Sequence, residues 1–317
     1  MKTWILFLIT LKATITMGQN TNPLLCDPKT GVCETSQSNQ KSERNLQNHS
    51  KKIEIIYYTD PICSSCWGIE PQLRKLKLEY GNEIVINYHM GGLLSDWSYN
   101  SGGISKPSDV AHHWDEVSPY YDMPIDGDIW LENPLDSSYP PSIAFKAAQL
   151  QDNDKAVIFL RELREMVFLE KKNITQWEHI ATAAQQAGLD ISKLKSDYEN
   201  QGRKEFQKDL ELARKIGIRG FPTVIFISGN KQEIVYGARP YALFEMAVLK
   251  LLPDATKQEY HKDWKSLFNY YPSLTAREFT ELSGMPRKDS EQLLNDLTQQ
   301  GILSKLETKN GAIWKIK

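Results

Sequence analysis

From residue 53 onward, hydrophobic residues follow strand spacing and helix spacing in turn. The run Ile53–Tyr58 is β-branched and aromatic, which is typical of a buried strand. Hydrophobic residues recur at helical spacing from Cys63 to Gly81, and Ile84–Tyr88 is a second run typical of a strand. This order predicts two parallel strands joined by a helical crossover.

Helical spacing continues almost without interruption from about 107 to 216. Two short runs, 224–227 and 234–236, then flank a Ser-Gly-Asn turn and predict a β-hairpin, and residues 240–252 predict a last amphipathic helix. We therefore expect an α/β domain over 51–253 with a large helical insertion at about 107–216.

The C-terminal residues 254–317 have the pattern of a separate small domain. Helices are predicted over 275–282 and 289–300, joined by a Ser-Gly-Met-Pro turn. Asn310-Gly311 is a strong hairpin signal before the strand-like run 313–316. Helix, turn, helix and β-wing together predict a winged-helix-like fold.

Residues 1–50 predict an N-terminal extension that carries a cysteine pair and ends in a flexible linker, because 35–50 are polar. The apolar stretch Thr3–Thr10 is too short to cross a membrane. It fits either a secretory signal or an untranslated extension before an internal start at Met17. We expect a cytoplasmic protein, or a periplasmic one if the apolar stretch is a true signal peptide.

Charge argues against nucleic acid and membrane surfaces as partners. The 317 residues carry a formal net charge of −2, with 38 Lys and Arg against 40 Asp and Glu. The second helix of the C-terminal domain holds Asp289, Glu291 and Asp296 and no basic residue over 289–300, so phosphate would repel it. We expect this domain to bind a second copy of the chain or another protein.

The candidate chemistry lies in Cys63-Ser64-Ser65-Cys66, directly after the first strand. Two cysteines three positions apart at the start of a helix lie on one face, which suits dithiol redox chemistry. The helix N-terminus is expected to lower the pKa of Cys63, which makes it the nucleophile, while Cys66 resolves the mixed disulfide. Zinc is the alternative for such a pair, but we predict no metal.

A second candidate segment is Phe221-Pro222-Thr223, just before the third strand. A proline at this position is excluded from a central ladder and fits a tight turn, either cis or trans. We expect Phe221, Pro222 and Thr223 to bind substrate. Trp67 is grouped with them, although packing at the helix start is the commoner role for such a tryptophan.

Cys26 and Cys33 form a C-x6-C pair, wider than the usual spacing of zinc ligands. Three alternatives stand: a mobile second dithiol that exchanges with Cys63 and Cys66, an accessory metal pair, or an inert pair. We favour the mobile dithiol as an accessory redox site.

With these motifs in view, residues 53–252 resemble the DsbA family of thioredoxin-fold proteins, in particular its FrnE-like branch. The resemblance is carried by Asp60-Pro61-x-Cys63-Ser64-x-Cys66-Trp67-Gly68, Gly91-Gly92-Leu93, Tyr139-Pro140-x-Ser142, Asp209-Leu210-x-Leu212-Ala213 and Gly217-x-x-Gly220-x-Pro222-Thr223. It implies that the proline loop faces the dithiol and that backbone groups beside the proline bind an extended peptide. Phe221 and Ser65 depart from the family pattern.

The resemblance implies an enzyme, a thiol–disulfide oxidoreductase or isomerase acting on proteins that contain cysteines. Its only cofactor would be the redox-active disulfide, with glutathione or thioredoxin as the candidate reductant. Two alternatives are a redox-responsive adaptor of the YjbH type, which presents client proteins to a protease, and a glutathione-dependent isomerase on the same fold, in which serine typically replaces the reactive cysteine.

Overall fold

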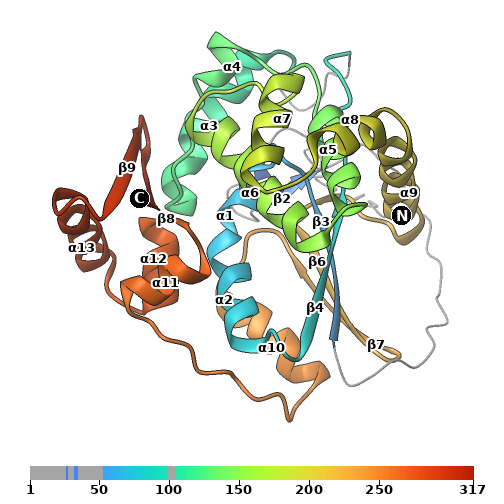
Figure 1. The fold of residues 1–317 in the computed structure, drawn as a ribbon. Helices are drawn as coiled ribbons and strands as arrows, with labels where there is room; N and C mark the ends of the chain where they lie inside the picture. The colour runs from blue at the N-terminus through green and yellow to red at the C-terminus, as the bar shows by residue number, and fades with distance from the viewer. Residues whose placement is uncertain (1–25, 28–31, 35–52, 99–103) are drawn as a thin grey trace, which may run out of the picture.

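The computed structural model describes residues 26–27, 32–34, 53–98 and 104–317. A four-stranded sheet in the order β4-β3-β6-β7 forms its centre (Figure 1). Its strands are β3 (Ile53–Thr59), β4 (Ile84–Met90), β6 (Thr223–Ser228) and β7 (Lys231–Tyr236). As predicted, β3 and β4 are parallel, with Ile53 opposite Ile84, and β6 and β7 are an antiparallel hairpin.

The alternating side chains of β3 enter two different cores. Ile53, Ile55 and Tyr57 pack in one cluster with α2 (Glu70–Tyr80) and α10 (Tyr241–Leu251). Ile56 and Tyr58 point to the opposite face and pack in a larger cluster with the helical part. The sheet is therefore buried on both faces, which explains the nearly unbroken apolar run in β3.

The helical part lies between β4 and β6 in sequence and above the sheet in Figure 1. Its helices are α3 (Pro107–Tyr121), α4 (Ile129–Glu132), α5 (Tyr139–Gln149), α6 (Asn153–Leu169), α7 (Trp177–Gln186), α8 (Ile191–Glu199) and α9 (Gln201–Ile216). The predicted fold class, α/β with a large helical insertion, is confirmed.

The helix that was predicted from Cys63 to Gly81 is interrupted. The structure has α1 (Ser64–Gly68) and α2, with a break at Ile69, whose φ and ψ are −100° and 4°. Pro71 lies in the first turn of α2, where a proline is tolerated because its missing N–H has no partner there. Hydrophobic spacing does not reveal this break, since Ile69 and Leu73 stay on one face.

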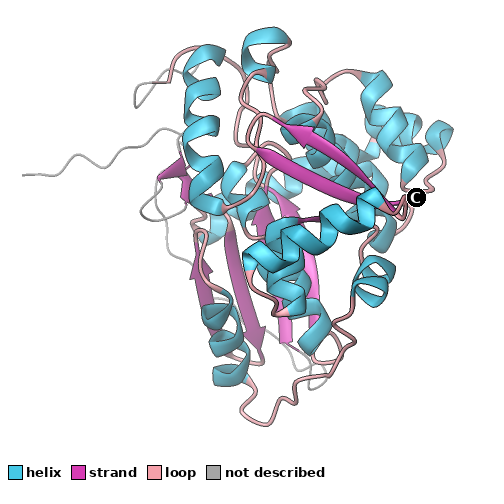
Figure 2. Cartoon of the chain, turned by 90° about the vertical axis from the view of Figure 1, so that its left-hand side faces the viewer, coloured by secondary structure: helices cyan, strands magenta, loops and turns pink. Residues whose placement is uncertain are grey.

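The C-terminal unit contains α11 (Trp264–Tyr270), β8 (Ser273–Thr275), α12 (Ala276–Ser283), α13 (Arg287–Gln299), β9 (Leu303–Thr308) and β10 (Gly311–Ile316). Its sheet has the order β8-β10-β9, and it has its own core, which includes Leu267, Phe279 and Trp314. This is the order of elements in a winged helix. Figure 2 views the molecule from the side of this unit.

Two short strands precede the main sheet: β1 (Cys26–Asp27) and β2 (Val32–Glu34). β2 pairs antiparallel with β5 (Gly220–Phe221), just before β6. The predicted linker over 35–50 and the apolar stretch 3–10 lie outside the described residues. Among the helices that the structure describes, none has the length and apolar character needed to cross a membrane.

Candidate functional site: a buried dithiol joined to the C-terminal unit

Cys63 and Cys66 lie where the chain leaves β3 and enters α1. Cys63 is the N-cap of α1, and the backbone N–H of Cys66 donates to its Sγ at 3.2 Å. Both side chains are 0% exposed. The structure therefore brings the two sulfurs together as predicted, but beneath the protein surface.

Burial changes the acidity expected of this pair. It raises the pKa of the Cys63 thiol, and the hydrogen bond to Cys66 and the charge of Cys66 raise this pKa further. Burial also acts to raise the pKa of Cys66, but the hydrogen bond from Cys63 and the Arg164 guanidinium outweigh it and lower that pKa. The predicted lowering of the Cys63 pKa by the helix N-terminus is wrong, because desolvation of a fully buried thiolate outweighs one backbone N–H.

Asp60 shapes the turn before the dithiol. Its carboxylate accepts hydrogen bonds from the backbone N–H groups of Ile62 at 3.1 Å and Leu93 at 2.8 Å, and from Ser138 Oγ at 2.8 Å. Burial raises the pKa of Asp60 to about 6, although these bonds act to lower it. Asp60 thereby ties the turn to the segment that follows β4 and to the start of α5.

Arg164 of α6 lies beneath the dithiol and was not predicted as a site residue. It is 0% exposed, and its Nη2 donates to Thr59 Oγ1 at 2.6 Å. Its Nη1 pairs with Glu70 of α2. One feature of the sequence could have identified it: Arg164 directly follows Leu163 within an apolar helical stretch, and a charged residue at such a position is usually buried with a partner.

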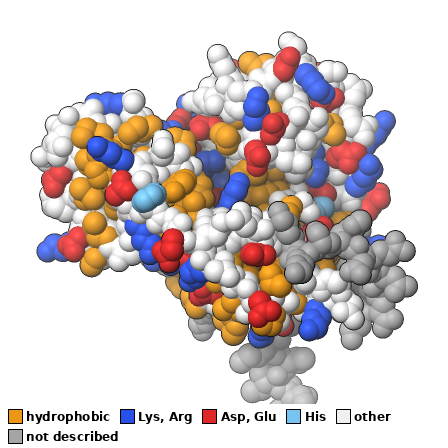
Figure 3. Space-filling view, turned by 60° about the horizontal axis from the view of Figure 1, so that its bottom comes forward, with side chains coloured by type: hydrophobic (Ala, Val, Ile, Leu, Met, Phe, Trp, Pro, Cys, Tyr) orange, Lys and Arg blue, Asp and Glu red, His pale blue; other side chains and the backbone are white. Residues whose placement is uncertain are grey.

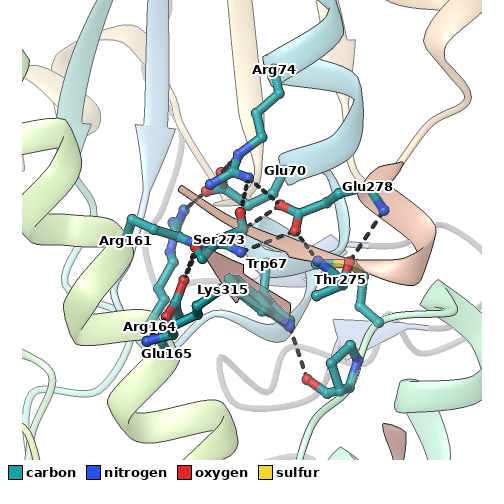
Figure 4. A network of polar contacts seen from close by, with 12 residues as sticks. Trp67, Glu70, Arg74, Arg161, Arg164, Glu165, Ser273, Thr275, Glu278 and Lys315 are labelled. Carbon is teal, nitrogen blue, oxygen red and sulfur yellow. Dashed lines mark hydrogen bonds and ion pairs between the residues drawn. The ribbon is translucent and has the colours of Figure 1, made fainter. Parts of the chain in front are cut away.

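A network of buried ion pairs connects this region to the C-terminal unit (Figure 4). Arg161 of α6 binds both carboxylate oxygens of Glu278 in α12, at 2.7 and 3.0 Å, and also binds Glu165 at 2.7 Å. Arg74 of α2 lies 3.2 Å from Glu278, and Lys315 of β10 lies 2.6 Å from Glu165.

The carboxylates of this network stay ionised because cations surround them. Burial alone would raise the pKa of Glu165, but Arg161 and Lys315 hold it at about 2. The Arg161 and Arg74 guanidinium groups likewise lower the pKa of Glu278 against the effect of its burial. The charged interface therefore fixes how the C-terminal unit lies against α2 and α6.

The proline loop lies at the dithiol end of the sheet. The Phe221–Pro222 peptide bond is cis, and Thr223 is the register partner of Tyr58, two residues before Asp60. Phe221 is fully buried and lies so close to Gly91 that a Cβ there would come within 1.7 Å of the Phe221 ring. The sequence predicted this loop to be part of a substrate site, but the structure shows Phe221 and Thr223 buried beneath other parts of the protein.

Trp67 is a core residue in the structure. Its ring stacks on Phe168 with centroids 5.5 Å apart, and Arg161 lies over its ring at 4.4 Å. Its Nε1 donates to the backbone oxygen of Pro124 at 3.0 Å. With no exposed surface, the side chain supports α1 rather than offering a contact to a bound peptide.

The backbones of Cys26 and Cys33 lie close to this region. Cys26 is the register partner of Cys33, and Cys33 is in turn the register partner of Phe221. Among the described residues, no group of three or more His, Cys, Asp and Glu side chains is placed to hold a metal ion.

Two cavities adjoin the C-terminal unit. One, of about 370 Å³, lies between α2, β4, α6 and residues 270–273, and exposes Ile158 and Tyr270. The other, of about 440 Å³, lies between the end of α3, α13 and the wing of the C-terminal unit. Figure 3 shows hydrophobic side chains on the C-terminal unit and in the hollow between it and the main body.

Comparison with known proteins first gives the class. A thioredoxin family model matches residues 57–246, more than half of the chain. A solved structure described as a putative protein disulfide isomerase from Nitrosomonas europaea aligns with a TM-score of 0.56 and 20% identity, covering 64% of this chain and 98% of that one. The cytosolic disulfide reductase DsbM from Pseudomonas aeruginosa aligns with a TM-score of 0.52 and 20% identity, covering 62% and 99%. These matches define a thioredoxin-fold protein.

Full-length relatives then give the family. The ClpXP adapter protein SpxH of Halalkalibacterium halodurans is 31% identical over 306 residues, which cover 94% of this chain and 99% of the relative. The protein of the same name from Bacillus subtilis is 28% identical, covering 86% and 92%. The chain therefore belongs to the SpxH family of thioredoxin-fold proteins.

These relatives correct the predicted function. The thioredoxin fold is confirmed, but the relatives do not support the FrnE-like branch, and their name is that of an adapter. The prediction of a thiol–disulfide oxidoreductase or isomerase is wrong, and so is the prediction of an enzyme. A C-x-x-C motif is compatible with both classes, and it does not show whether its sulfurs are accessible.

Proposed function

We propose that this protein is an adaptor that presents client proteins to the ClpXP protease. The observation that carries the proposal is the 31% identity to a ClpXP adapter protein over 94% of the chain and 99% of the relative. The match extends beyond the thioredoxin-like domain and includes the C-terminal unit. The burial of Cys63 and Cys66 supports the proposal, because a dithiol that exchanges with other proteins needs an accessible sulfur.

The cavity of about 370 Å³ is the site that we propose for a client segment. It joins the thioredoxin-like domain to the C-terminal unit, so both parts of the chain contribute to it. Ile158 is 47% exposed and Tyr270 is 42% exposed, and charged side chains such as Lys77 and Glu162 also line it. An apolar centre with a polar rim is typical of a protein-binding surface.

We place this adaptor in the cytoplasm, where thiols are kept reduced. We also propose that the C-terminal unit contacts a partner protein. A second copy of the chain is the alternative partner for this unit.

Protein turnover in the native cell tests the adaptor function. Half-lives would be measured across the proteome in wild-type cells, in cells lacking this gene and in cells lacking ClpX. We expect a group of proteins to be stabilised by both deletions, and one of them to be degraded faster by purified ClpXP when this protein is added. If the proteins stabilised in one deletion strain were all different from those stabilised in the other, the proposal would be refuted.

The double variant Cys63→Ser/Cys66→Ser separates an adaptor from a thiol enzyme. We expect this variant to restore turnover in the deletion strain, and we expect the wild-type protein not to accelerate insulin reduction by dithiothreitol. If a folded double variant failed to restore turnover, thiol chemistry would be essential and the adaptor proposal would be wrong.

The client site has its own test. Ile158→Asp places a charge in the cavity, and Leu131→Asp places the same charge on α4, where Leu131 is 59% exposed. We expect Ile158→Asp to weaken stimulation of ClpXP about tenfold or more, as for a central interface residue, and Leu131→Asp to have little effect. Equal activity of the two variants would place the client elsewhere.

A further inference from the structure

The N-terminal cysteine pair has a backbone geometry suited to a disulfide. Cys26 of β1 and Cys33 of β2 are directly opposite each other in an antiparallel pair. Opposite residues in such a pair have Cα atoms about 4.5 or 5.5 Å apart, and disulfides join Cα atoms about 4.4–6.8 Å apart. Their register therefore allows a disulfide without backbone movement.

The same hairpin covers the strand beside the proline loop. Cys33 is opposite Phe221 and Glu34 is opposite Gly220, so β2 takes up the free edge of β5. Cα atoms of β2 also come within 8 Å of Cα atoms of α1, the helix that carries Cys66. A segment of this chain thus occupies the edge that would otherwise be open to an extended peptide.

The hairpin is too short to be stable by itself. β1 has two residues and β2 has three, and an isolated two-stranded hairpin is marginal in water. A covalent link between its strands restricts the unpaired state and favours the paired one. A disulfide between Cys26 and Cys33 would be such a link.

We propose that Cys26 and Cys33 form a reversible disulfide that holds β2 on β5 and closes this edge to other peptides. In the oxidising direction, one thiolate attacks glutathione disulfide, forms a mixed disulfide and releases one glutathione. The second thiolate then displaces the remaining glutathione. The protein loses two protons and two electrons, and glutathione disulfide is reduced to two molecules of glutathione. Excess glutathione reverses both steps and frees the edge.

This inference goes beyond the adaptor function and does not depend on it. It concerns a modification site and the edge that it controls. It is an alternative to exchange with Cys63 and Cys66 as the role of the N-terminal pair.

Peptide mapping tests the disulfide in the full-length protein. The protein is equilibrated with glutathione disulfide, its free thiols are alkylated, and it is digested with trypsin without reduction. Cleavage after Lys29 separates Cys26 from Cys33, so their disulfide joins a peptide that ends at Lys29 to one that begins at Thr30. A disulfide from Cys26 or Cys33 to Cys63 or Cys66, or alkylation of both Cys26 and Cys33, would overturn the proposal.

Amide hydrogen exchange tests the control of the edge. We expect the amide of β5 that faces β2, on Gly220 or Phe221, to exchange about tenfold or more slowly after oxidation than after reduction, because pairing with β2 protects it. The Cys26→Ser/Cys33→Ser variant, treated in the same way, serves as the control and is expected to show no change. Equal exchange in the oxidised and reduced wild-type protein would show that the disulfide does not hold the hairpin on β5.

Discussion

The charged interface between the C-terminal unit and the rest of the chain makes a quantitative prediction. Glu278→Gln removes one negative charge and keeps the shape of the side chain. The amide oxygen can still accept from the Thr275 N–H, which lies 2.7 Å from the Glu278 carboxylate, so the start of α12 stays capped. What is lost is the attraction to Arg161 and Arg74.

Removing one partner of a buried ion pair costs about 3–5 kcal/mol. We expect the lower end for Glu278→Gln, because Arg161 keeps Glu165 at 2.7 Å and Arg74 keeps the Ser273 carbonyl at 2.8 Å. A loss of about 3 kcal/mol makes local opening roughly a hundredfold more frequent, since about 1.4 kcal/mol corresponds to a factor of ten.

Hydrogen exchange of the amides in β8 and α12 measures this opening. Glu291→Gln is a matched control, because Glu291 pairs with Arg287 at 2.8 Å on an exposed part of α13. An exposed pair contributes about 0–1 kcal/mol, so the control should change exchange by a factor of about five at most. If Glu278→Gln had no larger effect than this control, the interface would not depend on its buried charges.

The pH dependence of the same variant checks the cause. The folded-state pKa of Glu278 is lowered, so its charge stabilises the fold at neutral pH, and this contribution is lost as the pH falls through the folded pKa. The difference in free energy of unfolding between wild type and Glu278→Gln should therefore shrink below about pH 4, where an ordinary glutamate becomes protonated. A difference that stayed constant down to pH 2 would contradict a charge effect.

Three further predictions concern the dithiol region. The folded-state pKa of Asp60 is about 6, above the ordinary value, so the contribution of this residue to stability falls as the pH rises from about 4 to 6. Relative to Asp60→Asn, the wild type should lose about 3 kcal/mol of unfolding free energy over this range. If the difference in unfolding free energy between the two proteins did not change with pH, the prediction would be refuted. Gly91→Ala should lower the free energy of unfolding by about 1–3 kcal/mol, because the new Cβ meets the Phe221 ring; an unchanged denaturant midpoint would show that the ring can move away. Trp67→Ala should cost about 3–5 kcal/mol of unfolding free energy, whereas a tryptophan that only contacts a peptide would leave stability unchanged.

Local sequence signals predicted most of the fold. The apolar run in β3, the long helical spacing after it and the Asn310-Gly311 turn each reflect short-range preferences that tertiary packing does not oppose. The break at Ile69 was missed because Pro71 is compatible with the start of a helix as well as with its interruption. A single hydrophobic period cannot distinguish one helix from two collinear ones.

The candidate site was predicted less completely. The sequence places Cys63 and Cys66 together because three residues are less than one helical turn, but their burial depends on α3 and β2, which are distant in sequence and pack against α1. Arg164 was missed because its partners, Thr59 and Glu70, are about a hundred positions away. Long-range pairs of this kind leave no local pattern, and they decide the acidity and accessibility on which function depends.

The separation of 117 positions between Arg161 and Glu278 has a consequence for biosynthesis. A ribosome completes the sheet and the helices around it before α12 emerges, so the nascent thioredoxin-like domain holds Arg161 with Glu165 alone. Translation of the last sixty or so residues then supplies the missing carboxylate. An mRNA truncated after the codons for α10 would yield a domain in which the guanidinium groups of Arg74 and Arg161 lack Glu278 and face water instead.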